Sequence, residues 1–228
     1  MKAFGHVDTW VFDLDNTLYP ASCRLFDQMH VKMADYVMRR FGVDYPAAFQ
    51  IQKSLYQKYG TTLRGLMVEH GEAPQDFLAH VHDIDYGTVP HSPGLAAALS
   101  ALPGRKLVFT NGTTEHARRV MERLGVSTLF DGIYDIVDSD HIPKPAKEPY
   151  DKFLADFSVA ARSTAFFEDI ARNLEVPHAL GMVTVLVTSE GEGDAKRLTD
   201  ELPGAHVQHV TPDLTDFLTR IEQHEARQ

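Results

Sequence analysis

Two aspartates near the start of the sequence have the type and spacing of a site that handles charged substrates. Asp13 and Asp15 follow the apolar residues 10–12. Side chains two positions apart in a β-strand point to the same face, so both carboxylates are expected at one edge. Carboxylates that close repel each other unless a cation neutralises them or one holds a proton. The pair suits a metal-assisted site, but a bare pair is as often a strand that ends in an Asx turn, and it is the surrounding sequence that favours the site.

Three later stretches place further polar residues directly after apolar runs or before a helix. They are Thr110, Asn111 and Gly112 after residues 106–109, Lys144 before a proline, and Glu168 and Asp169 after residues 164–167. In open α/β sheets, ligands bind beyond the carboxyl ends of the strands. We therefore expect these residues to converge with the two aspartates.

Each stretch suggests a distinct chemical role. A hydroxyl and backbone N–H groups at a helix start, as at Thr110, can hold a phosphoryl oxygen. Lys144 offers a compact positive charge beside a carboxylate, and Lys147 could compete for that role. Glu168 and Asp169 offer the oxygen ligands that a hard divalent cation needs. Taken singly, Thr110 is equally typical of a helix cap and Lys144 of a solvated loop. Glu168 and Asp169 are equally typical of acidic residues that cap a helix dipole.

The elements that must position these residues fall into two groups. Apolar spacing predicts helices at 25–41, 47–59, 63–70 and 75–81, with no strand between 18 and 90. From residue 92, helices alternate with apolar strands at 106–109, 133–137, 164–167 and 182–187, followed by an edge strand at 207–210. This pattern predicts an α/β fold, a doubly wound parallel sheet with an inserted all-helical cap domain. We expect the core in residues 1–20 and 90–228, and the cap in residues 21–89.

Residues 11–19, V-F-D-L-D-N-T-L-Y, resemble the first signature of the haloacid dehalogenase superfamily of phosphatases. The later stretches match its other signatures, and the resemblance implies a Rossmann-like core with a helical cap. It also implies that Asp13 attacks phosphorus to form an aspartyl-phosphate, while Asp15 acts as general acid and then base. Thr110 would contact the phosphoryl group with Asn111 and Gly112 beside it, and Lys144 would be the matching catalytic lysine.

The same resemblance implies a Mg²⁺ cofactor. Its ligands would be Asp13, the main-chain carbonyl of Asp15, Asp169 and, directly or through water, Glu168. Dehalogenases that cleave carbon–halogen bonds lack the second aspartate, so Asp15 favours a phosphoryl donor over a haloacid.

Within the superfamily, residues 59–66, 80–86 and 166–174 resemble the pyrimidine 5′-nucleotidase group. This implies pyrimidine nucleoside 5′-monophosphates such as UMP or CMP as substrates. Arg64 lies in a polar turn that opens a short cap helix, so it is either a substrate contact through its N–H groups or a surface arginine of the cap. A phosphatase or mutase for small sugar or glycolate phosphates is the alternative, because it would share every core residue. A 2-haloacid dehalogenase is less favoured, and a noncatalytic module would be expected to have lost one of the signatures.

The composition indicates which classes of partner and which cellular compartment to expect. The 228 residues include 22 Lys and Arg against 32 Asp and Glu, a formal net charge of −10. That charge argues against nucleic acid or an anionic membrane as partner and leaves a small-molecule phosphomonoester. The single cysteine, Cys23, excludes an intramolecular disulfide, and no apolar stretch has the length of a signal peptide or membrane span. We expect a cytoplasmic protein, and the oligomeric state stays open.

Overall fold

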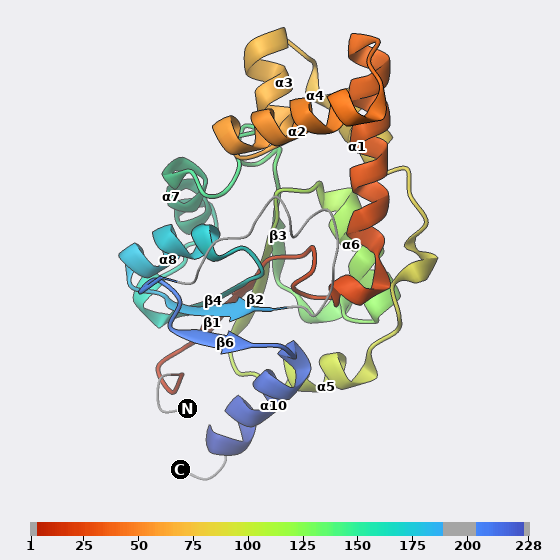
Figure 1. Ribbon diagram of the computed structural model, residues 1–228. Coiled ribbons are helices and arrows are strands. Elements are labelled where there is room, and N and C mark those ends of the chain that lie inside the picture. Colours follow the sequence, from red (N-terminus) through yellow and green to blue (C-terminus); the bar gives the residue numbers. More distant parts are fainter. Residues whose placement is uncertain (1–3, 189–203, 226–228) are drawn as a thin grey trace.

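The computed structural model describes residues 4–188 and 204–225, and a parallel sheet lies at its centre (Figure 1). The sheet has six strands in the order β3-β2-β1-β4-β5-β6, and every neighbouring pair is parallel. The strands are β1 (Thr9–Phe12), β2 (Arg105–Phe109), β3 (Gly132–Tyr134), β4 (Thr164–Glu168), β5 (Val183–Val187) and β6 (His209–Thr211). The chain builds outward from β1 in both directions, which is the predicted doubly wound arrangement.

Helices cover both faces of this sheet, as a parallel sheet requires. One face packs against α5 (Pro93–Ala101), α6 (Thr114–Leu124) and α10 (Leu214–Glu225), and the other against α7 (Lys147–Asp156) and α8 (Glu175–Leu180). The alternation is clear in β1, where Trp10 and Phe12 belong to the first apolar cluster and Val11 to the second. Short 3₁₀ helices lie in the connections: η1 (Ala21–Cys23), η2 (Tyr86–Thr88), η3 (Ser127–Leu129), η4 (Ala161–Ser163) and η5 (Ala171–Leu174).

Four helices form the insertion between β1 and β2. They are α1 (Leu25–Phe41), α2 (Tyr45–Tyr59), α3 (Thr62–His70) and α4 (Pro74–Val81), at the top of Figure 1. They bury an apolar cluster of their own, built on Met29, Leu55, Leu66 and Phe77. All of residues 13–104 are described, and none of them forms a strand. The apolar contacts do not stop at the expected domain limits, because Leu25 and Val89 pack into the core cluster.

Local side-chain chemistry explains where the elements differ from the sequence expectation. The strand expected at 133–137 ends at Tyr134, because the Asp135 carboxylate takes the N–H groups of Val137 and Asp138 at 2.8 and 2.9 Å. The helical segment after β4 begins as η5, since Glu168 Oε1 accepts the N–H groups of Asp169 and Ile170. None of the helices within residues 4–188 and 204–225 combines the length and apolar character needed to span a bilayer.

Candidate active site

The carboxyl ends of β1 and β4, with the loop after β3, bring three predicted residues into direct contact. Lys144 Nζ lies 2.7 Å from Asp13 Oδ1 and 2.7 Å from Glu168 Oε2. Its third hydrogen bond goes to the main-chain oxygen of Phe109 at 2.9 Å. The ammonium thus uses all three donors, and Lys144 is only 2% exposed. It is a fixed positive charge between two carboxylates.

Lys147, the alternative candidate, lies elsewhere. Its side chain is 64% exposed, and it pairs with Asp151 one turn along α7. The loop that carries Lys144 is held by Asn111, whose Oδ1 accepts the Lys144 N–H at 2.9 Å. The Asn111 side chain is therefore engaged in fixing the lysine loop.

The acidic residues at this sheet edge form a group suited to a cation. Carboxylate oxygens of Asp13, Glu168 and Asp169 all lie within 4.8 Å of one another. Burial, then the nearby Glu168, raise the pKa of Asp13 to about 7 even though Lys144 opposes the rise. Burial, then Glu168 and Asp13, hold the pKa of Asp169 well above its usual value. One lysine does not neutralise three carboxylates, so this donor set fits a divalent cation with oxygen ligands.

The two N-terminal aspartates do not share a strand face. β1 ends at Phe12, so the expectation that both carboxylates project from an extended strand is wrong, and they occupy separate surroundings. Asp13 Oδ2 accepts a hydrogen bond from the Thr17 hydroxyl at 3.1 Å. Asp15 Oδ1 accepts hydrogen bonds from Tyr19 Oη at 2.6 Å and from His116 Nε2 at 2.8 Å.

These surroundings move the two pKa values in opposite directions. Burial alone would raise the pKa of Asp15, but the charge and hydrogen bond of His116, together with the Tyr19 hydrogen bond, lower it overall. The pKa of Asp13 is raised. Pairs of carboxylates separated in this way are typical of sites that divide nucleophilic and proton-transfer roles between two residues.

The turn after β2 supplies donors for an anion. The buried Thr110 hydroxyl accepts the Gly112 N–H at 2.9 Å, so it keeps its own proton to donate. Thr113 then caps α6 by accepting the His116 N–H at 3.2 Å. The N-terminus of α6 therefore begins at this turn, where backbone N–H groups favour negative charge.

Comparison with known proteins agrees with this geometry. A family model described as haloacid dehalogenase-like hydrolase matches residues 7–181. The chain belongs to this hydrolase family. Its fold is the Rossmann-like core with a helical cap that the family resemblance implies.

One curated protein is similar to this hydrolase in sequence. This hydrolase is 28% identical to Phosphate metabolism protein 8 of Saccharomyces cerevisiae over 194 residues. The aligned region covers 77% of this chain and 60% of that protein. The chain thus spans less than two thirds of that relative.

Three solved structures show the same fold. CbbY from Rhodobacter sphaeroides, in complex with phosphate, has a TM-score of 0.65 at 14% identity and covers 92% of this chain and 96% of its own. YfnB from Bacillus subtilis, bound to magnesium, has a TM-score of 0.60 at 15% identity and covers 95% and 98%. L-2-haloacid dehalogenase from Xanthobacter autotrophicus has a TM-score of 0.57 at 15% identity and covers 94% and 98%. At these identities the likeness concerns the fold alone.

The cap of this hydrolase rests on the segments that carry the site. Gly60, between α2 and α3, has a φ of +84°, and a Cβ there would lie 3.1 Å from Pro143 Cγ, next to Lys144. The Arg172 guanidinium, three residues after Asp169, lies 4.4 Å from the centre of the Tyr56 ring on α2. Cap residues therefore contact both the loop that carries Lys144 and the segment that follows Asp169.

Arg64, the substrate contact suggested by the sequence, lies in the first turn of α3. Its N–H donates to the Thr61 hydroxyl at 3.1 Å, which caps that helix. The side chain is half-buried, and its guanidinium forms no ion pair within residues 4–188 and 204–225. This leaves the guanidinium available for another acceptor, four residues from the glycine that touches the lysine loop.

Sequence reasoning missed the partners of Asp15. Tyr19 stands in the first signature, four residues after Asp15, and its place in that turn is a signal that could have identified it. His116 carries no such signal, because it is one of several polar residues in α6 and its partner Asp15 is 101 positions away.

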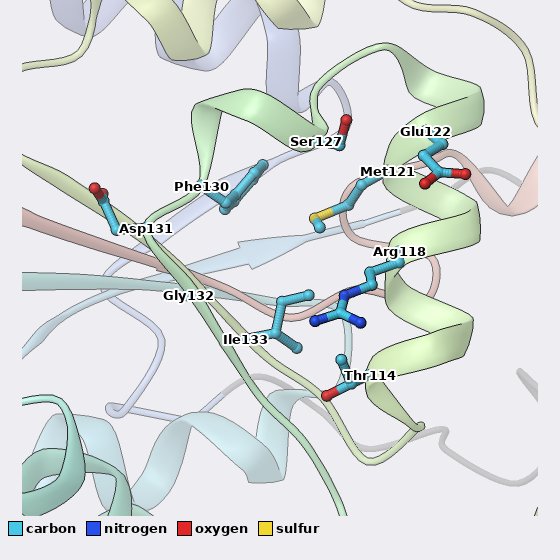
Figure 2. A pocket seen from close by; sticks show the side chains of 9 residues that line it. All are labelled: Thr114, Arg118, Met121, Glu122, Ser127, Phe130, Asp131, Gly132 and Ile133. Carbon is cyan, nitrogen blue, oxygen red and sulfur yellow. The ribbon is translucent and has the colours of Figure 1, made fainter.

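A separate surface pocket of about 500 Å³ lies between α6, η3 and β3 (Figure 2). Figure 2 shows the Arg118 side chain extending from α6 toward Ile133. The lining contains none of the residues that hold Lys144 or Asp15, and its mixed charges select no ligand of either sign. We therefore locate the chemistry at the carboxyl ends of the strands.

Proposed function

We propose that this hydrolase is a Mg²⁺-dependent phosphomonoester hydrolase that works through an aspartyl-phosphate on Asp13. The observation that carries the proposal is the buried contact of Asp13 with Lys144, inside a group of three carboxylates. This environment gives a carboxylate one fixed positive neighbour and room for a cation, which suits attack on an anionic substrate.

The reaction divides between the two aspartates. Asp13 attacks phosphorus in line, the bond to the leaving oxygen breaks, and Asp15 gives that oxygen a proton. Asp15 then takes a proton from water, which attacks the aspartyl-phosphate and releases phosphate with Asp13 restored. The Thr110 hydroxyl holds a phosphoryl oxygen through this sequence, and the Lys144 ammonium, whose three donors are occupied, stabilises the negative charge of Asp13 and of the phosphoryl group from its fixed place.

Asp13, Asp169 and Glu168, with the main-chain carbonyl of Asp15, would hold the metal ion. When bound, Mg²⁺ supplies positive charge that favours the ionised form of Asp13 and offsets the charge of the phosphoryl oxygens. The lowered pKa of Asp15 describes the protein without a bound substrate. A phosphoryl dianion beside Asp15 raises that pKa, because a like charge disfavours ionisation, and this prepares the residue to carry a proton.

For the substrate, we propose a pyrimidine nucleoside 5′-monophosphate, selected by the cap of residues 21–89. Arg64 supports this choice, because its guanidinium forms no ion pair within the described residues and it lies in α3, the helix that follows the glycine beside the lysine loop. The name of Phosphate metabolism protein 8 and the phosphate in CbbY are consistent with phosphate chemistry. A small sugar or glycolate phosphate is the alternative, because the core residues contact only a phosphoryl group. We expect the enzyme in the cytoplasm, without nucleic-acid partners.

A substrate panel tests the proposal. Phosphate release is measured with UMP, CMP, sugar phosphates and phosphoglycolate, and chloride release with 2-chloropropionate, each with Mg²⁺ and with excess chelator. We expect phosphate release only with Mg²⁺, and Asp13→Asn should lower it at least about a thousandfold, or ~4 kcal/mol in the barrier. Chloride release without phosphate release would assign the chain to the dehalogenases instead.

A further inference from the structure

The two oxygens of the Asp15 carboxylate have unlike surroundings. Oδ1 receives both hydrogen bonds, from Tyr19 Oη at 2.6 Å and from His116 Nε2 at 2.8 Å. Oδ2 receives none from the described residues, and it lies 3.8 Å from the position of a Cβ built on Gly112, in the turn that follows β2. With two donors on Oδ1, a proton carried by Asp15 resides on Oδ2. That oxygen faces the turn proposed to bind the phosphoryl group.

His116 is held from three sides. The residue has no exposed surface, and its Nδ1 lies 2.9 Å from Tyr86 Oη. The ring stacks on His82, with centroids 4.5 Å apart and planes 14° from parallel. Both ring nitrogens and one ring face are therefore used, which leaves the imidazole a single orientation.

The partners of His116 belong to the segment that returns the chain from the cap. His82 follows the last residue of α4, and Tyr86 opens η2. With Asp15 ionised, Nε2 carries the proton in its hydrogen bond to Oδ1. The Tyr86 hydroxyl donates either to Nδ1 or to the main-chain oxygen of His82, 3.3 Å away. Both arrangements keep the bond from His116 to Asp15.

We propose that His116 is a positioning residue for the general acid, resting on the phosphomonoesterase function proposed above. It fixes Oδ1 of Asp15 so that Oδ2 presents its proton to the leaving oxygen, and Tyr86 and His82 fix His116 in turn. Proton delivery is thereby linked to the cap segment of residues 82–86. A base oriented by a third group is a recurring arrangement in enzymes, and here the same logic applies to an acid.

Leaving groups of different basicity separate this role from a structural one. The quantity measured is kcat/KM, which covers the steps up to release of the alcohol. p-Nitrophenolate leaves without a proton at neutral pH, whereas the alkoxides of UMP and glycerol phosphate need one. In His116→Phe we expect kcat/KM for the alkyl esters to fall about 100-fold through kcat, with p-nitrophenyl phosphate within about threefold.

Two further variants and a control complete the test. His116→Gln keeps an N–H donor and should recover at least about tenfold of the alkyl-ester loss, and Tyr86→Phe should show a smaller loss of the same selectivity. Glu122→Gln, on the exposed side of α6, should match the wild type on all esters. Equal losses on both ester types, or none, would overturn the inference. If His116→Phe turns over neither ester, Tyr86→Phe decides by the same comparison. A wild type that releases phosphate from no ester would instead remove the proposed function, and this inference with it.

Discussion

The ammonium of Lys144 lies 2.7 Å from Asp13 Oδ1, although the two residues are 131 positions apart in the sequence. The contact forms because the loop after β3 and the end of β1 meet at one edge of the sheet. Lys144 and Glu168 have side chains only 1% exposed, and that of Asp13 is 9% exposed. Buried charges are stable only when they are paired. Removing one of these side chains therefore leaves the others buried without a counterion, which is unfavourable.

Replacing Lys144 by Met should therefore destabilise the protein strongly when no divalent cation is present. Asp13 and Glu168 would face each other without a counterion, and we expect the free energy of unfolding at neutral pH to fall by about 3–5 kcal/mol. Urea unfolding in chelator measures this. Lys147→Met, which removes an exposed lysine from the same region, should change the value by less than about 1 kcal/mol. Equal effects of the two substitutions would contradict the counterion role of Lys144.

Mg²⁺ should raise the thermal stability of the apoprotein, and Asp169 should be needed for the effect. Binding to the folded state alone adds about 2.7 kcal/mol at a ligand concentration 100 times Kd. We expect a Mg²⁺-dependent rise in Tm in the wild type and little or none in Asp169→Ala, while Asp151→Ala, an exposed residue on α7, should keep it. The same comparison in activity assays should show loss in chelator and recovery on adding Mg²⁺. Activity in excess chelator equal to that in Mg²⁺ would contradict a metal-dependent reaction.

Much of the fold and the acidic edge of the site followed from the sequence, for a physical reason. Strands of a parallel sheet are buried on both faces, so their apolar runs are distinct, and polar residues just after them must gather at one edge. This placed Asp13 near Glu168 and Asp169. The expected limits of the cap, between residues 20 and 21 and between 89 and 90, stay a prediction.

Side-chain pairings were less accessible to sequence reasoning. Which oxygen of Asp15 is occupied depends on the rotation of α6 about its axis, which packing decides. The contact of the Asn111 side chain with the main chain of Lys144 depends on how two loops meet. The cation–π contact of Arg172 with Tyr56 depends on where the cap lies on the core. None of these relations has a period or a spacing in the sequence.

Stability should also fall in mild acid, and His82 should account for part of the loss. Burial, then the proximity of His116, lower the pKa of His82 to about 3, against the opposing effect of Asp15. His82 binds a proton near pH 6.5 in the unfolded chain and only near pH 3 in the folded protein. The contribution of neutral His82 to the free energy of unfolding is therefore complete above about pH 6.5 and declines as pH falls. His82 is half-buried, and solvent screening limits the effect to about 1–2 kcal/mol.

Urea unfolding at pH 5 and pH 7.5 measures this contribution. The difference between the two pH values should be smaller in His82→Gln than in the wild type, by about 1–2 kcal/mol. His70→Gln, a substitution at an exposed position on α3, should keep the wild-type difference. An unchanged pH dependence in His82→Gln would show that His82 is protonated equally in both states.

Substrate choice should depend on Arg64 in the cap, whereas the core contacts only the phosphoryl group. A hydrogen bond from the planar guanidinium to a base carbonyl or ribose hydroxyl would serve UMP, and p-nitrophenyl phosphate has neither group. In Arg64→Ala we expect kcat/KM for UMP to fall about 10- to 100-fold, equivalent to ~1.4–2.7 kcal/mol, with little change for p-nitrophenyl phosphate. Arg64→Lys should restore only part of the loss, because lysine keeps the charge without the fork of N–H groups.

Arg39→Ala, which breaks an exposed pair with Asp35 on α1, is the matched control and should leave the ratio of kcat/KM for the two substrates unchanged. Equal losses on both substrates in Arg64→Ala would assign Arg64 to the phosphoryl group or to cap closure, and no loss on either would leave it a surface residue of the cap.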